Sequence, residues 1–187
     1  IRPNTGISSP VLTLTLSGVD VFDGNQWYVS VGRNRNDLIG DGTGVGNKEA
    51  KKFIYEACEY KYTFLNYSPN LGLINNVDMD HPDFFTGIDH VVDTYQKFAD
   101  RCEALVINFD DEHCKKINHD NKYTFGLTKG ADMSMLNITK NKGGFSFDLE
   151  FRGTKLGNHQ VPFYGDHMVL NLLAVLTIGY IQEVDVE

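Results

Sequence analysis

A strand–helix–strand pattern between residues 71 and 109 constrains the fold more than any other feature of this chain. Residues 71–77 (LGLINNV) and 104–109 (ALVINF) are short apolar runs of the kind found in strands buried on both faces. Between them, residues 88–102 carry apolar side chains at helical spacing. Two strands of one sheet that are joined through a crossing helix run parallel. The pattern therefore predicts an α/β fold with a parallel sheet.

Other segments extend this pattern on both sides. Residues 52–57 (KFIYEA) form a third short apolar run, and residues 26–31 (QWYVSV) predict a further short strand. Residues 145–151 alternate strictly between apolar and polar side chains, which is typical of an antiparallel strand with one solvated face. An apolar helix is expected over residues 166–180. We predict an α/β domain with a mainly parallel sheet flanked by helices and a small antiparallel sheet within residues 123–163.

Composition narrows the functional class. The 187 residues include 17 Lys and Arg against 25 Asp and Glu, so the formal net charge is −8. An acidic surface argues against a non-specific binder of nucleic acid or of an anionic membrane. The three cysteines form no recognisable disulfide framework and no signal peptide opens the chain, which predicts a reduced, cytoplasmic compartment. The longest apolar run, residues 168–181, is shorter than a membrane span.

Polar side chains follow each of the three apolar runs. They are Glu56 and Glu59 after the first run, Asn76, Asp78, Asp80 and His81 after the second, and Asp110 and Asp111 after the third. In open parallel sheets, ligands bind in the crevice beyond the carboxyl ends of the strands. Oxygen and imidazole donors gathered there suit a divalent cation that carries a phosphorylated substrate. Acids after strands also serve as turn residues and helix N-caps, so both interpretations of Asp110 and Asp111 stay open.

Two of these groups indicate function more strongly than the others. Glu56 lies within an apolar run, where a buried carboxylate is costly unless a cation or hydrogen-bond donors meet it. Residues 78–83 (DMDHPD) place carboxylates and an imidazole close together, although such a run alone also fits a capped loop. The glycine-rich residues 40–46 (GDGTGVG) lead into an expected strand rather than a helix. We therefore interpret them as a surface loop and not as a phosphate-binding loop.

Taken together, the motifs resemble the central ATPase domain of the Mur ligases over about residues 34–180. The matching segments are EACEY (56–60), SPNLGLINNVDMDHPDFF (68–85), VINFDDE (106–112), YTFGL (123–127) and YGDHMVLN (164–171), with NDLIGDG (36–42) upstream. They occur in the family's order and at its separations. The resemblance implies that residues 1–187 form a single central domain of P-loop NTPase-like fold. It also implies that the chain is a fragment without the UDP-binding and carboxyl-terminal amino-acid-binding domains that flank this domain in the family.

The resemblance also implies an activity. The family joins an amino acid to a nucleotide-linked muramyl carboxylate. ATP first phosphorylates this carboxylate to an acyl phosphate. The amino group of the amino acid then attacks the acyl phosphate, and phosphate leaves. In the branch that this chain resembles, the substrates are ATP, UDP-N-acetylmuramate and L-alanine, and the reaction belongs to peptidoglycan synthesis. Mg²⁺ ions bridge the phosphates and the carboxylate. The isolated domain is expected to be inactive without its flanking domains.

Site residues carry over from the resemblance by motif. Glu56 and His81 resemble the ligands of a magnesium ion, and Asn76 and Asp80 resemble the polar catalytic residues that hold that site. A strand-end carboxylate and imidazole can fix one cation while leaving positions for phosphate and water. Imidazole is not a typical ligand of a hard cation, so the role of His81 depends on the resemblance more than on its chemistry.

The nucleotide-binding residues carry over less completely. His167 and Asn171 resemble residues of the adenine pocket. The family's phosphate loop aligns best with PNTGISS near the start of the chain, where Gly6 matches a glycine and Ser8 stands for a hydroxyl metal ligand. Ile7 replaces the lysine of that loop, which removes the cation that neutralises the β- and γ-phosphates.

Four interpretations follow from these residues. The first is the ATPase domain of the alanine-adding ligase, which the sequences EACEY and DHPD favour. The second is the related ligase that recycles murein tripeptide. The third is a non-catalytic remnant, which the missing lysine favours. The fourth, from the acidic and histidine side chains alone, is a metal-dependent phosphohydrolase that turns over substrate without partner domains.

Overall fold

The computed structural model of the chain describes residues 28–31, 52–55, 57–142, 144–162 and 166–183, with the side chains of residues 57–142, 144–162 and 168–183. Two compact units are present. The smaller unit combines Ile1–Ala57 with Gly179–Glu187, and the larger unit is Cys58–Ile178. Each unit is described by itself below. The prediction of a single domain over residues 1–187 stays a prediction.

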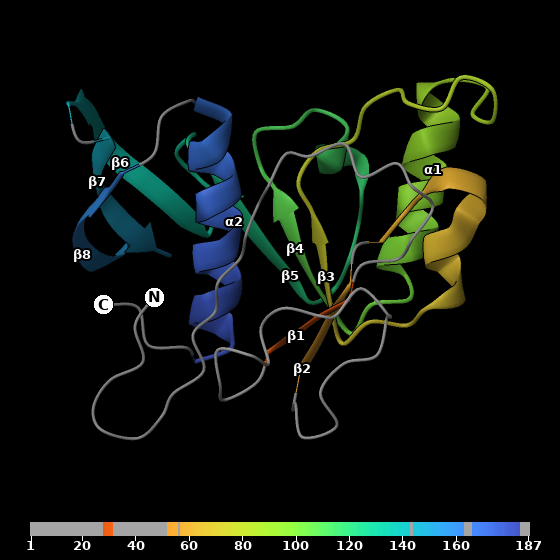
Figure 1. Cartoon of the computed structure of the whole chain (residues 1–187), viewed down its shortest axis with the longest axis horizontal. Helices are drawn as coiled ribbons and strands as arrows, with labels where there is room; N and C mark the ends of the chain where they lie inside the picture. The colour runs from red at the N-terminus through yellow and green to blue at the C-terminus, as the bar shows by residue number, and fades with distance from the viewer. Residues whose placement is uncertain (1–27, 32–51, 56, 143, 163–165, 184–187) are drawn as a thin grey trace. The chain divides into compact units, whose positions relative to one another are not determined.

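The larger unit is built on one six-stranded sheet with the strand order β3-β4-β5-β6-β7-β8 (Figure 1). The strands are β3 (Leu71–Ile74), β4 (Ala104–Asn108), β5 (Lys122–Gly126), β6 (Met133–Asn141), β7 (Gly144–Phe151) and β8 (Thr154–Val161). The pairs from β3 to β6 are parallel, and the pairs from β6 to β8 are antiparallel. The predicted fold class is therefore confirmed, and the antiparallel strands continue the parallel sheet.

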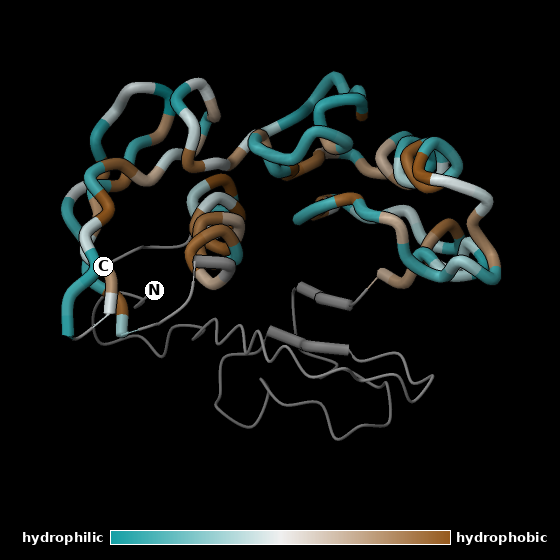
Figure 2. Tube along the Cα trace, turned by 90° about the horizontal axis from the view of Figure 1, so that it is seen from above, coloured by the Kyte–Doolittle hydropathy of each residue, from teal (hydrophilic) through white to brown (hydrophobic). Residues whose placement is uncertain are grey.

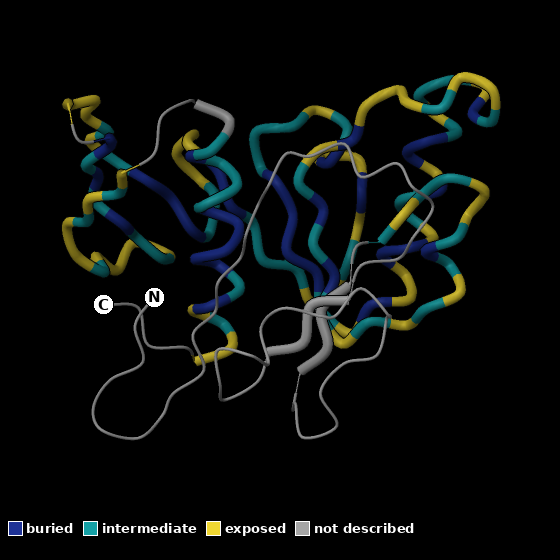
Figure 3. The backbone as a smooth tube through the Cα atoms, viewed as in Figure 1, coloured by how far each residue is buried: buried dark blue, intermediate teal, exposed yellow. Residues whose placement is uncertain are grey.

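The strand–helix–strand prediction is confirmed at β3, α1 (Ile88–Ala99) and β4. β3 and β4 pair in parallel, with Leu71 opposite Ala104 and Ile74 opposite Ile107. Three successive residues of β4, Leu105 to Ile107, are buried, as expected for a strand covered on both faces. Figure 3 shows the same concentration of buried residues along the central strands of the sheet.

The 3₁₀ segment η2 (Tyr60–Asn66) packs against α1. Its Phe64 is buried at 1% exposure and stacks on Phe98 of α1, with ring centroids 4.8 Å apart and planes within 5°. Tyr95 of α1 meets the same ring edge-on at 5.4 Å. Aromatic contacts of this kind add to the stability that burial alone provides. They hold η2 next to the helix that follows β3.

The antiparallel part of the sheet follows the alternation seen in the sequence. Phe145, Phe147 and Leu149 of β7 are buried, and the polar residues between them are more exposed. Asp148 lies between Phe147 and Leu149 in β7. Its carboxylate accepts one hydrogen bond from the side-chain amide of Asn137 at 2.7 Å and another from a side-chain amide of β8. β6 and β7 change register between Leu136 and Thr139, where Asn137 has a φ of 53°.

Two described strands lie wholly in the smaller unit. β1 (Tyr28–Val31) and β2 (Lys52–Tyr55) form an antiparallel pair. Residues 52–57 were predicted to be the first of three strands ending at one sheet edge. This is wrong for the described residues, because β2 pairs with β1 and the six-stranded sheet begins at β3. A short apolar run predicts a strand, but it does not determine the direction or identity of the partner strand.

The last helix, α2 (Asp166–Ile181), is apolar around most of its circumference (Figure 2). Val169, Leu173 and Leu176 are buried, and the hydroxyl of the buried Thr177 donates to the Leu173 carbonyl at 2.7 Å. A helix that is apolar on all sides is expected in a core. Within the part of the chain that the structure describes, no helix is both long and apolar enough to span a bilayer.

Close packing at Gly72 generates a first prediction. A Cβ added there would lie 2.5 Å from the Cys102 sulfur, 3.2 Å from Phe98 and 3.4 Å from Leu105. Overpacking a dense core costs about 1–3 kcal/mol. We expect Gly72→Ala to lower the free energy of unfolding by that amount in urea denaturation. Gly87→Ser is the control, because a Cβ at Gly87 meets nothing within 4 Å; an equal loss in both variants would contradict the packing argument.

The carboxylate of Asp132 generates a second prediction. Burial alone would raise its pKa, but hydrogen bonds from Arg152 at 2.7 Å and from Thr124 outweigh burial and lower it. A carboxyl with a lowered pKa in the folded state stabilises the protein above its unfolded pKa of about 3.9. This contribution is lost as the pH falls through the folded-state pKa.

We therefore expect Asp132→Asn to be less stable than the unmodified chain at pH 7, by about 1–3 kcal/mol for weakened hydrogen bonds to a charged group. The difference should shrink below pH 4, as measured by urea denaturation across pH. The exposed Asp120→Asn is the control. A stability difference that does not depend on pH would contradict a role for the ionised carboxylate.

Candidate metal site

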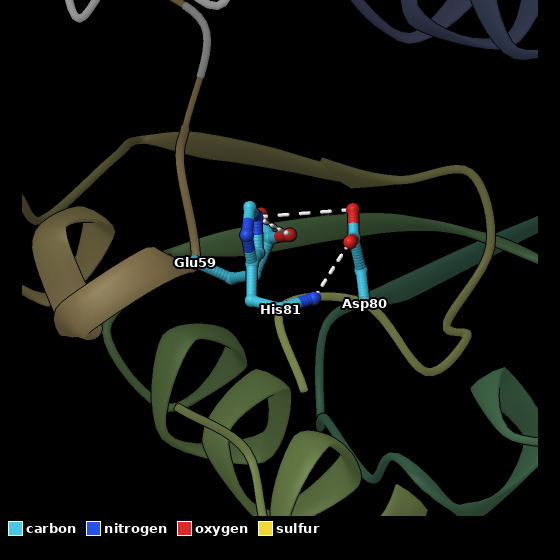
Figure 4. Close-up of side chains that lie close together, drawn as sticks. All are labelled: Glu59, Asp80 and His81. Carbon is cyan, nitrogen blue, oxygen red and sulfur yellow. Dashed lines mark hydrogen bonds and ion pairs between the residues drawn. The ribbon is translucent and has the colours of Figure 1, made fainter. Parts of the chain in front are cut away.

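Three side chains that can bind a metal ion converge just beyond the carboxyl end of β3 (Figure 4). Glu59 immediately precedes η2, whereas Asp80 and His81 belong to the loop between β3 and α1. The His81 Nε2 lies 3.5 Å from Glu59 Oε1 and 3.8 Å from Asp80 Oδ2. One donor atom from each residue lies within 4.8 Å of the other two.

A tight turn in the loop after β3 presents His81 to this cluster. His81 adopts a φ of 48°, a conformation that is uncommon for residues other than glycine. Its carbonyl accepts hydrogen bonds from the backbone N–H groups of Phe84 and Phe85, each at 2.9 Å. Its own N–H donates to Asp80 Oδ1 at 2.6 Å, so this carboxylate shapes the turn with one oxygen and faces the imidazole with the other.

Aromatic packing fixes the other side of the imidazole. The Tyr60 ring lies 4.7 Å from the His81 ring, centroid to centroid, and meets Phe84 edge-on at 5.6 Å. The Tyr60 hydroxyl donates to Asp83 Oδ2 at 2.8 Å, and this hydrogen bond raises the pKa of Tyr60. The phenol therefore stays protonated and ties η2 to the loop after β3. The imidazole is held between a backbone turn and an aromatic ring.

The donor chemistry of the cluster fits a divalent cation. Two carboxylates supply oxygen ligands and negative charge, and His81 supplies one nitrogen. The side chains of His81 and Glu59 are 16% and 20% exposed, whereas that of Asp80 is 65% exposed. One side of the cluster therefore lies within the fold and the other is open to solvent, which leaves room for water or a phosphorylated ligand.

The structure tests the sequence-based metal ligands only in part. It brings His81 together with Asp80, which was expected to hold the site. Glu59 was expected only as one of several oxygen donors gathered at the strand ends, and no individual ligand role was assigned to it. Its position three residues after Glu56 was the available signal. Glu56, the other expected ligand, lies outside the described residues, so its role stays a prediction.

Asp78, in the same loop, does not belong to the cluster. Asp78 is exposed, and its Oδ1 accepts the Met79 N–H at 2.7 Å. Asn76 is also exposed, and its expected role at the site stays a prediction. The buried Oδ1 of the neighbouring Asn75 has no hydrogen-bond partner among the described residues.

The two acids after β4 are occupied with backbone groups. Asp110 accepts hydrogen bonds from the N–H groups of Leu127 at 2.6 Å and Thr128 at 3.2 Å, so it joins the end of β4 to the end of β5. Asp111 Oδ1 accepts from the N–H groups of His113 and Cys114, at 3.0 and 2.7 Å. Of the two interpretations left open by the sequence, these contacts support the role of turn residues.

The expected nucleotide-binding residues are only partly described. Gly6 and Ser8 lie outside the described residues. His167 belongs to α2, but its side chain is not described. Asn171 is half-buried in the same helix. The nucleotide-binding roles of all four residues stay predictions.

Comparison with known proteins assigns the family. The Mur ligase middle domain model matches residues 41–179, which is more than half of the chain. UDP-N-acetylmuramate–alanine ligase MurC of Thermotoga maritima has a similar structure, with a TM-score of 0.58 and 22% identity over 66% of this chain and 28% of that one.

Two further solved structures are similar to this chain. UDP-N-acetylmuramate:L-alanyl-γ-D-glutamyl-meso-diaminopimelate ligase of Neisseria meningitides has a TM-score of 0.54 and 22% identity, over 66% of this chain and 38% of that one. MurF ligase of Thermotoga maritima in complex with ADP has a TM-score of 0.51 and 18% identity, over 64% of this chain and 29% of that one. The chain thus spans well under half the length of these enzymes, and at these identities they show the fold. By the match to the middle-domain model, the chain belongs to the Mur ligase family.

Proposed function

We propose that this chain is the ATP-binding central domain of an amide-forming ligase that joins L-alanine to UDP-N-acetylmuramate in peptidoglycan synthesis. Membership of the Mur ligase family supports an ATP-dependent ligase. The choice of L-alanine depends on EACEY and DHPD, because the similar structures include ligases named for different substrates. The UDP-binding and amino-acid-binding domains would come from other parts of the same enzyme.

One observation carries the proposal beyond family membership. His81, Asp80 and Glu59 converge beyond the carboxyl end of β3, in the loop where the resemblance expects a magnesium ligand. That edge of a parallel sheet is where ligands of α/β proteins bind. The cluster is half open to solvent, as a site that receives a phosphorylated substrate needs to be.

The chain's own residues would bind and orient the reacting groups. His81 and Glu56 would hold the cation, and Asp80 and Asn76 would support the site from the loop after β3. A bound Mg²⁺ supplies charge neutralisation for the phosphates of ATP. The turn at His81 and the ring of Tyr60 keep the imidazole in one orientation. Since phosphoryl transfer depends mostly on positioning, a rigid loop of this kind is the main contribution expected of the domain.

Two alternatives remain in the same family. The ligase that recycles murein tripeptide has a comparable structural similarity, and its substrate differs only in what is joined to the muramyl group. A non-catalytic remnant would explain Ile7 in place of the phosphate-loop lysine. The odd number of cysteines, which form no recognisable disulfide framework, supports the proposed reducing, cytoplasmic location.

ATP titration of the purified chain, with and without Mg²⁺, tests the nucleotide-binding role. We expect saturable binding that requires Mg²⁺, and an affinity at least about tenfold lower in His81→Ala and Glu56→Gln because each removes a ligand of the cation. Isothermal calorimetry measures both. Glu103→Gln, an exposed acid remote in sequence from the cluster, is the control and should bind like the unmodified chain.

The same samples separate the alternatives. If the chain does not bind ATP at millimolar concentration, the nucleotide-binding role is contradicted and the interpretation as a non-catalytic remnant is favoured. Phosphate release from ATP by the chain alone would favour a phosphohydrolase over a ligase domain. Circular dichroism of each variant shows whether a lost affinity reflects lost folding.

A further inference from the structure

We propose that Glu59 is a direct cation ligand, so that Glu59, Asp80 and His81 form one three-donor site with two oxygens and one nitrogen. This inference depends on the cation role in the proposed function, but it concerns a residue that the sequence placed only among several strand-end donors and that the family resemblance did not name as a ligand. The alternative is that Glu59 merely forms an ion pair with a protonated His81.

The separations between the donor atoms favour a shared ion over an ion pair held by a hydrogen bond. The 3.5 Å between His81 Nε2 and Glu59 Oε1 exceeds the usual N–H···O range of about 2.7–3.2 Å. Two ligands that each lie about 2.0–2.2 Å from one ion, at angles between about 90° and 120°, are about 2.8–3.8 Å apart. The separations of 3.5 Å from His81 to Glu59 and 3.8 Å from His81 to Asp80 fall in that range, and the donor atoms of Glu59 and Asp80 lie within 4.8 Å of each other.

Burial gives a second, independent argument. The Glu59 side chain is only 20% exposed and faces an imidazole, which is charged only when it is protonated. A carboxylate withdrawn from water is costly unless a positive group meets it. A divalent cation between Glu59 and the more exposed Asp80 would offset the charge of both carboxylates.

The segment that carries Glu59 is anchored well enough to preorganise such a site. The Glu59 carbonyl accepts the Tyr62 N–H at 3.0 Å. Further along η2, Phe64 is buried against Phe98 of α1, and Tyr60 is hydrogen-bonded to Asp83 in the loop that carries His81. Glu59 therefore reaches the imidazole from a segment that is held to the loop after β3 by its neighbours. A ligand positioned this way loses little freedom when an ion binds.

The donor set also predicts which ion binds best. Mg²⁺ prefers oxygen ligands and gives up its water reluctantly, whereas imidazole nitrogen suits first-row transition metals. Mn²⁺ accepts both carboxylate oxygen and imidazole nitrogen. We expect the metal-free chain to bind Mn²⁺ more tightly than Mg²⁺, without any nucleotide.

A titration of the purified chain with Mn²⁺ alone tests the proposal. Electron paramagnetic resonance reports free Mn²⁺, and hence the number of ions bound and their dissociation constant. We expect one ion to bind, an increase of about tenfold or more in the dissociation constant for Glu59→Gln and for Asp80→Asn, and weak displacement by Mg²⁺. Asp78→Asn is the matched control: Asp78, like Asp80, is exposed and accepts the N–H of the following residue, but it lies outside the cluster.

The results that overturn the proposal are specific. Mn²⁺ affinity in Glu59→Gln equal to that of the unmodified chain would leave Glu59 as an ion-pair partner only. An equal loss in Asp78→Asn would mean that the ion is attracted by the general negative charge of the loop. Thermal unfolding of each variant excludes misfolding as the cause. The Mn²⁺ titration contains no nucleotide, so it tests the Glu59 assignment separately from the proposed function. If the chain binds Mn²⁺ as expected but does not bind ATP, the proposed function is contradicted and the Glu59 assignment stands.

Discussion

Parallel pairing of β3 with β4 is the constraint on which the rest of the larger unit depends. Two parallel strands require a crossing connection, and here that connection consists of the loop after β3 and the helix α1. The loop must leave the sheet at the carboxyl end of β3 before the chain can return along α1. That requirement places Asp80 and His81 at the sheet edge where ligands bind in α/β folds. The site is therefore a consequence of the topology.

The crossing helix has a second role, because it anchors the segment that brings Glu59 to the same place. Phe64 of η2 packs on Phe98 and Tyr95 of α1, while Tyr60 reaches across to the loop after β3. Core packing and site geometry thus share the same side chains. A change that loosens the aromatic contacts would be expected to disturb the cluster even though it touches none of the three donor residues.

The acidic residues that follow the strands have two different structural roles. Asp110 accepts from backbone N–H groups just after β5 and so joins the ends of β4 and β5, whereas Asp111 accepts from backbone N–H groups in the turn that follows β4. Asp80 divides its two oxygens between a backbone N–H and the side facing His81. Acids in equivalent sequence positions therefore take different roles, according to which backbone donors lie within reach.

The sequence by itself determined the elements whose signal is local. Apolar periodicity located α1, β3, β4 and β7, and the ordered motifs indicated the family and the importance of His81, because side-chain patterns repeat with the geometry of each element. Only the tertiary structure decided that β2 pairs with β1, that Asp110 and Asp111 hold backbone groups, and that Glu59 faces His81. Each of these depends on which distant segment lies nearby. Strand partners and side-chain contacts are set by packing across the whole unit, and no local pattern in the chain encodes them.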